Sequence, residues 1–123
     1  MNCAYNALSA LTRAQYGRLV GSEPVRDFAT RAIAETVAVA RAEGVSLSEP
    51  VLIEAASQLA EKMTRATSSM ARDIARGRPT EIDSLNGYVV RRAASLGIAT
   101  PVSEILVAMV KLLEESALSG RSG

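Results

Sequence analysis

The chain contains no histidine, no tryptophan and a single cysteine, Cys3, among its 123 residues. Without histidine, the Ser/His/Asp triad, histidine metal sites and the commonest general base are all excluded. One cysteine cannot form an intramolecular disulfide, and we expect Cys3 to be a small buried hydrophobic residue. Any chemistry must therefore use carboxylates, hydroxyls, amides, lysine or arginine, and we expect no metal site.

Aromatic residues and net charge are also scarce. Aromatic residues make up 3% of the chain and hydrophobic residues 48%, so the core must consist mainly of Ala, Val, Ile, Leu and Met. The 14 basic and 13 acidic residues give a formal net charge of +1, which argues against a nucleic-acid partner. Because no apolar run approaches the ~20 residues of a membrane span and no signal-peptide pattern is present, we expect a cytoplasmic protein without membrane contact.

Apolar residues recur at intervals of three or four residues along the chain, which is the spacing of amphipathic helices. No segment shows the period-two alternation of a β-strand. The pattern, with its serine, threonine, proline and glycine signals, predicts helices over residues 4–19, 22–43, 48–76, 80–96 and 100–115, with a possible bend or break at residues 67–69. We therefore predict one all-α domain spanning residues 1–123, in which residues 116–123 form a frayed tail.

Thr80 and Asp83 have the spacing of a capping box, in which the hydroxyl accepts a backbone N–H at the third helical position. Helix capping explains Thr80 and Asp83 but does not account for Glu81. The simplest interpretation of Glu81 is a carboxylate in the first helical turn, which the helix dipole favours by ~0.3–1 kcal/mol. A role in a functional site is the alternative.

The same region contains adjacent serines, Ser68 and Ser69, which lower helix propensity. Either their hydroxyls bond back to the preceding turn, or one of them faces a cavity and donates to a ligand oxygen. Near the start of the chain, Asn2 and Asn6 lie four residues apart and so share one helix face. N-terminal capping or solvent exposure explains them about as well as ligand binding does. A solvated charged face explains the nearby Arg72, Asp73, Arg76 and Arg78.

Three stretches in this order, NCAYNALSAL, SSMARDIARGRPTEIDSLNGYVV and GIATP, resemble the C-terminal domain of the ketopantoate reductase (2-dehydropantoate 2-reductase) family. The resemblance extends from Asn2 to about Leu113 and implies a compact multi-helix domain like the C-terminal domain of 6-phosphogluconate dehydrogenase. In that family an N-terminal Rossmann domain holds NADPH, and the helical domain helps to form the substrate site between the two. Hydride passes to the ketone carbon of a 2-keto acid and yields a 2-hydroxy acid, a step of pantothenate biosynthesis.

The resemblance also implies roles for particular residues. Asn2, Asn6 and Ser69 match the substrate-binding residues of the family, and Glu81 matches its catalytic acidic residue, which contacts the substrate or its lysine. The general acid of the family is a lysine four residues before the first asparagine, a position ahead of Met1, and the Rossmann domain is absent as well. We therefore expect the chain to be catalytically inactive alone and to bind no cofactor by itself.

Two functions follow from these observations. The first is the substrate-binding and dimer-forming domain of a reductase, with a 2-keto acid, the missing nucleotide-binding domain and a second copy of the chain as partners. The second is a non-enzymatic helical module for self-association or partner binding. The mean hydropathy of +0.13 is high for a small soluble protein and indicates an exposed apolar surface, which suits either function.

Overall fold

The computed structural model describes residues 3–63, 65 and 67–122, and it contains helices and turns but no strand among those residues. The all-α prediction is therefore confirmed for the described part of the chain. The helices are α1 (Cys3–Thr12), α2 (Tyr16–Val20), α3 (Glu23–Ala42), α4 (Glu49–Lys62), α5 (Ser69–Ala75), α6 (Asn86–Leu96) and α7 (Pro101–Ser122). None of the described helices combines the length and apolar character needed to cross a bilayer.

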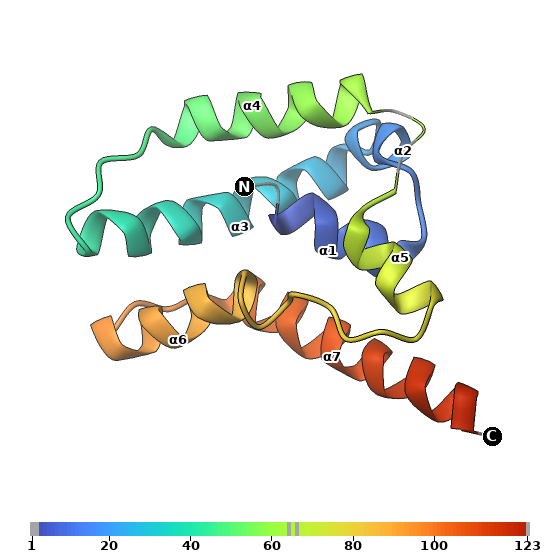
Figure 1. Cartoon of the computed structure of the whole chain (residues 1–123). Helices are drawn as coiled ribbons and strands as arrows, with labels where there is room; N and C mark the ends of the chain where they lie inside the picture. The colour runs from blue at the N-terminus through green and yellow to red at the C-terminus, as the bar shows by residue number, and fades with distance from the viewer. Residues whose placement is uncertain (1–2, 64, 66, 123) are drawn as a thin grey trace.

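The long helix α3 runs across the middle of the molecule (Figure 1). Helix α4 turns back along one side of α3, and α6 and α7 lie on the other side. Helix α1 packs against α2, α3, α5 and α7, so it forms the centre of the domain. This arrangement brings α1 beside α5, which lies about 60 residues later in the sequence.

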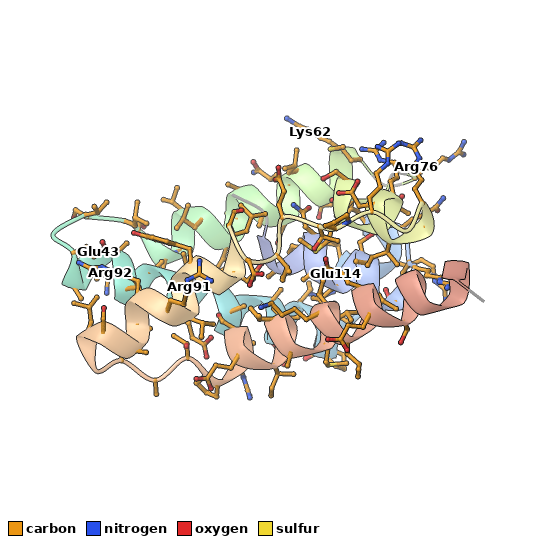
Figure 2. The ribbon with its side chains drawn as sticks, turned by 60° about the horizontal axis from the view of Figure 1, so that its bottom comes forward. Glu43, Lys62, Arg76, Arg91, Arg92 and Glu114 are labelled. Carbon is orange, nitrogen blue, oxygen red and sulfur yellow. The ribbon has the colours of Figure 1, made fainter. Side chains whose placement is uncertain are left out.

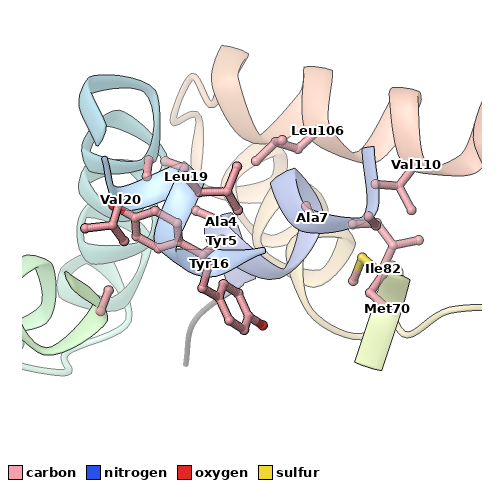
Figure 3. Close-up of a cluster of buried hydrophobic side chains, with 14 of the residues drawn as sticks. Ala4, Tyr5, Ala7, Tyr16, Leu19, Val20, Met70, Ile82, Leu106 and Val110 are labelled. Carbon is pink, nitrogen blue, oxygen red and sulfur yellow. The ribbon is translucent and has the colours of Figure 1, made fainter. Parts of the chain in front are cut away.

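The core surrounds α1, whose buried face consists mostly of alanines. Small side chains let neighbouring helices approach closely, and Ala7 on this face is completely buried. Figure 3 shows Leu106 and Val110 of α7 near Ala7, with Ile82 grouped below Val110. Leu106 and Val110 are both 0% exposed and Ile82 is 1% exposed. The core is therefore mainly aliphatic, as the composition predicts, but Tyr5 and Tyr16 are also buried in it.

The predicted first helix is wrong in one respect, because it is interrupted after Thr12. The Thr12 hydroxyl donates to the Leu8 carbonyl (2.7 Å) and accepts from the Ala14 backbone N–H (3.1 Å), so it competes with the helical hydrogen bonds. Arg13 then adopts a positive φ of 62°, and its N–H donates to the Ser9 carbonyl (2.8 Å). The chain turns here and starts again as α2.

The predicted third helix is divided as well, and the possible break near residues 67–69 is present. Helix α4 ends at Lys62 and α5 begins at Ser69. Ser68 is the N-cap of α5, and its hydroxyl oxygen accepts the Ala71 backbone N–H at 3.0 Å. The serine pair therefore starts a new helix and does not lie inside a long one.

The capping box predicted at Thr80 is wrong, because α6 begins at Asn86. The Thr80 hydroxyl accepts the Ile82 backbone N–H (3.2 Å), two residues on, and the chain forms turns up to residue 85. Asp83 is exposed and forms ion pairs with Lys111 (2.8 Å) and Arg91 (3.8 Å). Burial of Ile82 in the core holds this segment as a turn. The glycine that ends α6 is placed as predicted, with Gly97 at φ 72°.

Helix α7 begins at Pro101 as predicted, but its free N–H groups are capped by a residue far away in the sequence. The carboxylate of Glu35 in α3 accepts the N–H groups of Val102 (2.9 Å) and Ser103 (2.7 Å). A carboxylate at this end of a helix also interacts favourably with the helix dipole. Glu35 thus joins α3 to α7. The helix continues to Ser122, past the Glu115 boundary predicted from the sequence.

Candidate functional site

The junction of α1 and α5 is held by Ser68, which is 2% exposed. Its hydroxyl donates to the Asn6 carbonyl (2.9 Å), and its backbone N–H donates to the Ser9 hydroxyl oxygen (3.2 Å). The Ser9 hydroxyl in turn donates to the Ala14 carbonyl (3.1 Å). These bonds fix the start of α5 against the turn of α1 that carries Asn6.

The side chain of Asn6 is held by Tyr16, the first residue of α2. The Tyr16 hydroxyl donates to Asn6 Oδ1 at 2.7 Å. Because Oδ1 is occupied, the Asn6 amide offers its Nδ2–H groups as donors to another acceptor. Burial raises the pKa of Tyr16 above its ordinary value of 10.0, while a hydrogen bond with Ser68 and the positive charge of Arg72 act in the opposite direction. Tyr16 therefore stays protonated at neutral pH, as this hydrogen bond requires.

Ser69 and Glu81 are both exposed, in contrast to Ser68. Ser69 is the first residue of α5 and directly follows the serine that bonds to Asn6, so the structure brings Asn6 and Ser69 to one junction. Glu81 lies in the turn before α6, so its predicted place in a helical first turn is wrong. Within the described residues, no hydrogen bond or ion pair joins Glu81 to Asn6 or Ser69. Asn2 and the side chain of Cys3 lie outside the described part of the chain.

The turn that carries Glu81 is nevertheless held in place from both sides. The backbone N–H of Thr80 donates to Oε2 of Glu114 in α7 (3.0 Å), and the Glu81 carbonyl accepts the N–H groups of Ser84 and Leu85 (both 3.0 Å). Figure 2 shows Glu114 over the middle of α7. The backbone that carries the Glu81 side chain therefore keeps a defined position relative to the core.

The sequence alone did not reveal Tyr16 as a residue that orients a candidate ligand group. The only signal in the sequence was that aromatic residues are scarce. The structure shows that Tyr16 is 5% exposed, and a tyrosine buried to this extent needs a hydrogen-bond partner for its hydroxyl. Spacing could not identify that partner, because Asn6 lies in another helix. The partner became evident only once α1 and α2 were placed together.

The described residues contain neither a metal-binding cluster nor a strand that could carry a nucleotide-binding turn. They include no group of three or more His, Cys, Asp or Glu side chains that could hold a metal ion. Dinucleotide diphosphates usually rest on a glycine-rich turn between a strand and a helix, and the described residues contain no strand. The described helices therefore lack the glycine-rich strand–turn–helix motif that usually binds a nicotinamide cofactor.

Comparison with known proteins gives a consistent result. The sequence matches the family model described as ketopantoate reductase PanE/ApbA C terminal over residues 1–114. A 2-dehydropantoate 2-reductase from Halobacterium salinarum is 43% identical over 93% of this chain and 37% of its own length. The crystal structure of a PanE/ApbA family ketopantoate reductase from Ralstonia eutropha has a TM-score of 0.86 and 48% identity, covering 94% of this chain and 39% of that one.

A further similar structure is the ternary complex of D-mandelate dehydrogenase with NADH and anilino(oxo)acetate. It has a TM-score of 0.90 and 27% identity, and the match covers 94% of this chain and 38% of that one. The chain therefore spans about two fifths of the length of these relatives. The covered part is a helical domain in which Asn6 and Ser69 lie at one junction.

Proposed function

The chain belongs to the ketopantoate reductase C-terminal family, and on this premise we propose that it is the substrate-binding domain of an NADPH-dependent 2-dehydropantoate 2-reductase. Such an enzyme reduces a 2-keto acid to a 2-hydroxy acid. The observation that carries the proposal is the α1–α5 junction, where the hydrogen bond between Ser68 and the Asn6 carbonyl sets Asn6 beside the exposed Ser69.

The chemistry of this junction suits a small hydroxylated keto acid. The keto and carboxylate oxygens of such a substrate are hydrogen-bond acceptors, and the Asn6 amide and the Ser69 hydroxyl are neutral donors. Neutral donors orient the substrate without placing a second strong charge beside its carboxylate. Tyr16 occupies the acceptor atom of Asn6 and so leaves its donors for the substrate.

We also propose Glu81 as the catalytic acidic residue. Its carboxylate is exposed on a turn that is anchored to α7 through Thr80 and Glu114. We assign it a contact with the substrate or with the lysine that acts as the general acid of the family. That lysine and the NADPH-holding domain are proposed to come from a polypeptide or segment other than residues 1–123.

A reconstitution experiment tests the proposed function. Purified chain with ketopantoate and NADPH is expected to show no NADPH oxidation above background, because the hydride donor site and the general acid are supplied elsewhere. Adding a separately produced nucleotide-binding domain from a relative, which includes that lysine, should restore turnover. Asn6→Ala, Ser69→Ala and Glu81→Gln should then each lower kcat/KM by about ten-fold or more, since each removes one substrate-orienting group.

Ser46→Ala is a matched control, because Ser46 is an exposed serine in the turn before α4, and it should leave the rate unchanged. No turnover in a mixture with saturating nucleotide-binding domain would contradict the reductase proposal and favour the non-enzymatic module. An unchanged rate in Ser69→Ala would remove that residue from the site.

A second property follows from the exposed face of α7. Ile105, Met109 and Leu112 are 50%, 48% and 64% exposed, and their spacing places them on one side of the helix. A contiguous apolar face that points away from the core marks an interaction surface, and identical chains pair most often through the same face about a two-fold axis. We propose that this face of α7 forms a homodimer.

Sedimentation equilibrium tests the dimer. The unaltered chain should sediment as a dimer at micromolar concentration, and Leu112→Glu should shift it to a monomer because a charge would be buried in the interface. Val51→Glu is the matched control, since Val51 in α4 is also 64% exposed, and this variant should remain dimeric. A monomeric unaltered chain, or dissociation by Val51→Glu and not by Leu112→Glu, would contradict the assignment to α7.

A further inference from the structure

A hollow of about 390 Å³ lies between the end of α1, the segment before α5 and α5 itself. Its lining residues include two arginines, one threonine and four apolar residues. The lining residues are Ala10, Arg13, Thr67, Ala71, Arg72, Ile74 and Ala75. A neighbouring hollow of about 320 Å³ shares Arg13, Ile74 and Ala75 and reaches α7. Arg13 therefore stands between two adjoining depressions.

Arg13 occupies a strained backbone position. It is the only non-glycine residue with a positive φ in the described part of the chain, at 62°, and the other residues with positive φ are Gly44, Gly77 and Gly97. A left-handed conformation costs an L-residue roughly 1–2 kcal/mol, and the position just after a helix usually holds glycine or asparagine for this reason. Strained residues cluster at functional sites. A charged residue at this strained position therefore suggests a binding role for the Arg13 side chain.

The charge around the hollow is positive. Arg13 and Arg72 line it together, and no carboxylate is among its lining residues. The ion pairs formed by Arg91, Arg92 and Lys111 lie on other elements, α6 and α7. Two arginines on the rim of one hollow repel each other, and an anion bound between their guanidinium groups would remove that repulsion.

The lining chemistry indicates the kind of anion. Guanidinium groups bind phosphate oxygens in pairs of parallel hydrogen bonds, and a threonine hydroxyl adds a further donor. Two arginines suit two linked phosphates, while the alanines and Ile74 can contact an apolar organic part. The near-neutral chain, with a formal charge of +1, favours a small molecule over nucleic acid.

We propose that this hollow binds the diphosphate group of a small organic molecule. The hollow adjoins the Asn6 and Ser69 junction, because Thr67 and Arg72 lie on either side of Ser69 in the sequence, but it is lined by other side chains. Along α1, Ala10 lies about one turn and Arg13 about two turns beyond Asn6, a displacement of roughly 6–10 Å. The proposal therefore does not depend on the reductase function, and the two can fail independently.

The test is a titration of the isotopically labelled chain with sodium pyrophosphate at constant ionic strength, followed by amide N–H chemical shifts. The amides of residues 10–13 and 67–75 should shift and saturate, with a Kd of about 1 mM or lower. Arg72→Gln and Arg13→Gly should each weaken binding about ten-fold or more, because each removes one charged donor pair. Inorganic phosphate should bind about ten-fold more weakly than pyrophosphate, because it engages one phosphate position.

Two controls separate binding from folding and from general charge. Arg13→Gly places glycine at a positive φ, so its Tm should be equal or higher, and lost binding cannot then result from unfolding. Arg31→Gln alters an exposed arginine on α3 and should leave the affinity unchanged. Shifts that rise without saturating, that persist in Arg13→Gly, or that weaken equally in Arg31→Gln would overturn the site. Equal affinity for phosphate and pyrophosphate would overturn the diphosphate assignment.

Discussion

Replacing Ser68 with alanine is expected to lower the free energy of unfolding by about 2–3 kcal/mol, while the same change at Ser69 alters it by less than about 0.5 kcal/mol. The Ser68 hydroxyl accepts the Ala71 N–H and donates to the Asn6 carbonyl, and its residue is 2% exposed. Alanine would remove the helix cap and leave buried polar groups without this partner. Ser69 is exposed and makes no such bonds in the described structure.

Urea unfolding followed by circular dichroism measures this difference, with the adjacent Ser69→Ala serving as the control of identical chemistry. Turnover in the reconstituted enzyme should show a different pattern. Ser69→Ala should lower the activity without lowering the free energy of unfolding. Ser68→Ala should lower the free energy of unfolding. Equal destabilisation by the two variants would mean that the bonds of Ser68 contribute little to the α1–α5 junction.

The second large effect is expected at Leu106, where replacement by alanine should cost about 3–5 kcal/mol of stability. The Leu106 side chain is 0% exposed and packs from α7 toward α1 in the centre of the core (Figure 3). Removing a fully buried leucine loses its transfer free energy and leaves a cavity that the surrounding helices fill only partly. Because domains of this size are stable by about 5–15 kcal/mol in total, this single change would remove a large share.

Leu112→Ala on the same helix provides the matched control, since Leu112 is 64% exposed and its truncation should change the unfolding free energy by less than about 0.5 kcal/mol. Both values come from thermal or urea unfolding below the concentration at which the chain dimerises. A cost at Leu106 below about 1 kcal/mol would contradict the packing of α7 on α1.

These two positions show how stability and the candidate site are linked. Leu106 holds α7 against α1, and α1 carries Asn6. Ser68 then joins Asn6 to α5, which begins with Ser69. The groups proposed to meet the substrate are exposed at Ser69 and Glu81 and half-buried at Asn6, whereas the residues that place them are buried. Substitutions behind the site should for this reason disturb it as much as substitutions within it.

Much of the fold was readable from the sequence because its signals act over short distances along the chain. Apolar periodicity predicted a helical domain, and Pro101 and Gly97 marked helix ends that the structure confirms. The boundaries predicted at Arg13, at the start of α6 and at the end of α7 were wrong. The turn at Arg13 and the late start of α6 at Asn86 break helical patterns that continue in the sequence. Both result from contacts and burial that the local pattern does not report.

The residues of the candidate site also fall into those that the sequence indicated and those that only the structure identified. The sequence and its resemblance indicated Asn6, Ser69 and Glu81, because residue types at a fixed spacing survive as a recognisable pattern. Only the tertiary structure showed which of the two serines supports the fold, which tyrosine holds the Asn6 amide, and that Arg13 and Arg72 share a hollow. The physical reason is distance along the chain. Helix propensity depends on neighbours within a few residues, whereas Ser68 meets Asn6 and Glu35 caps α7 across separations of 62 and 67 residues.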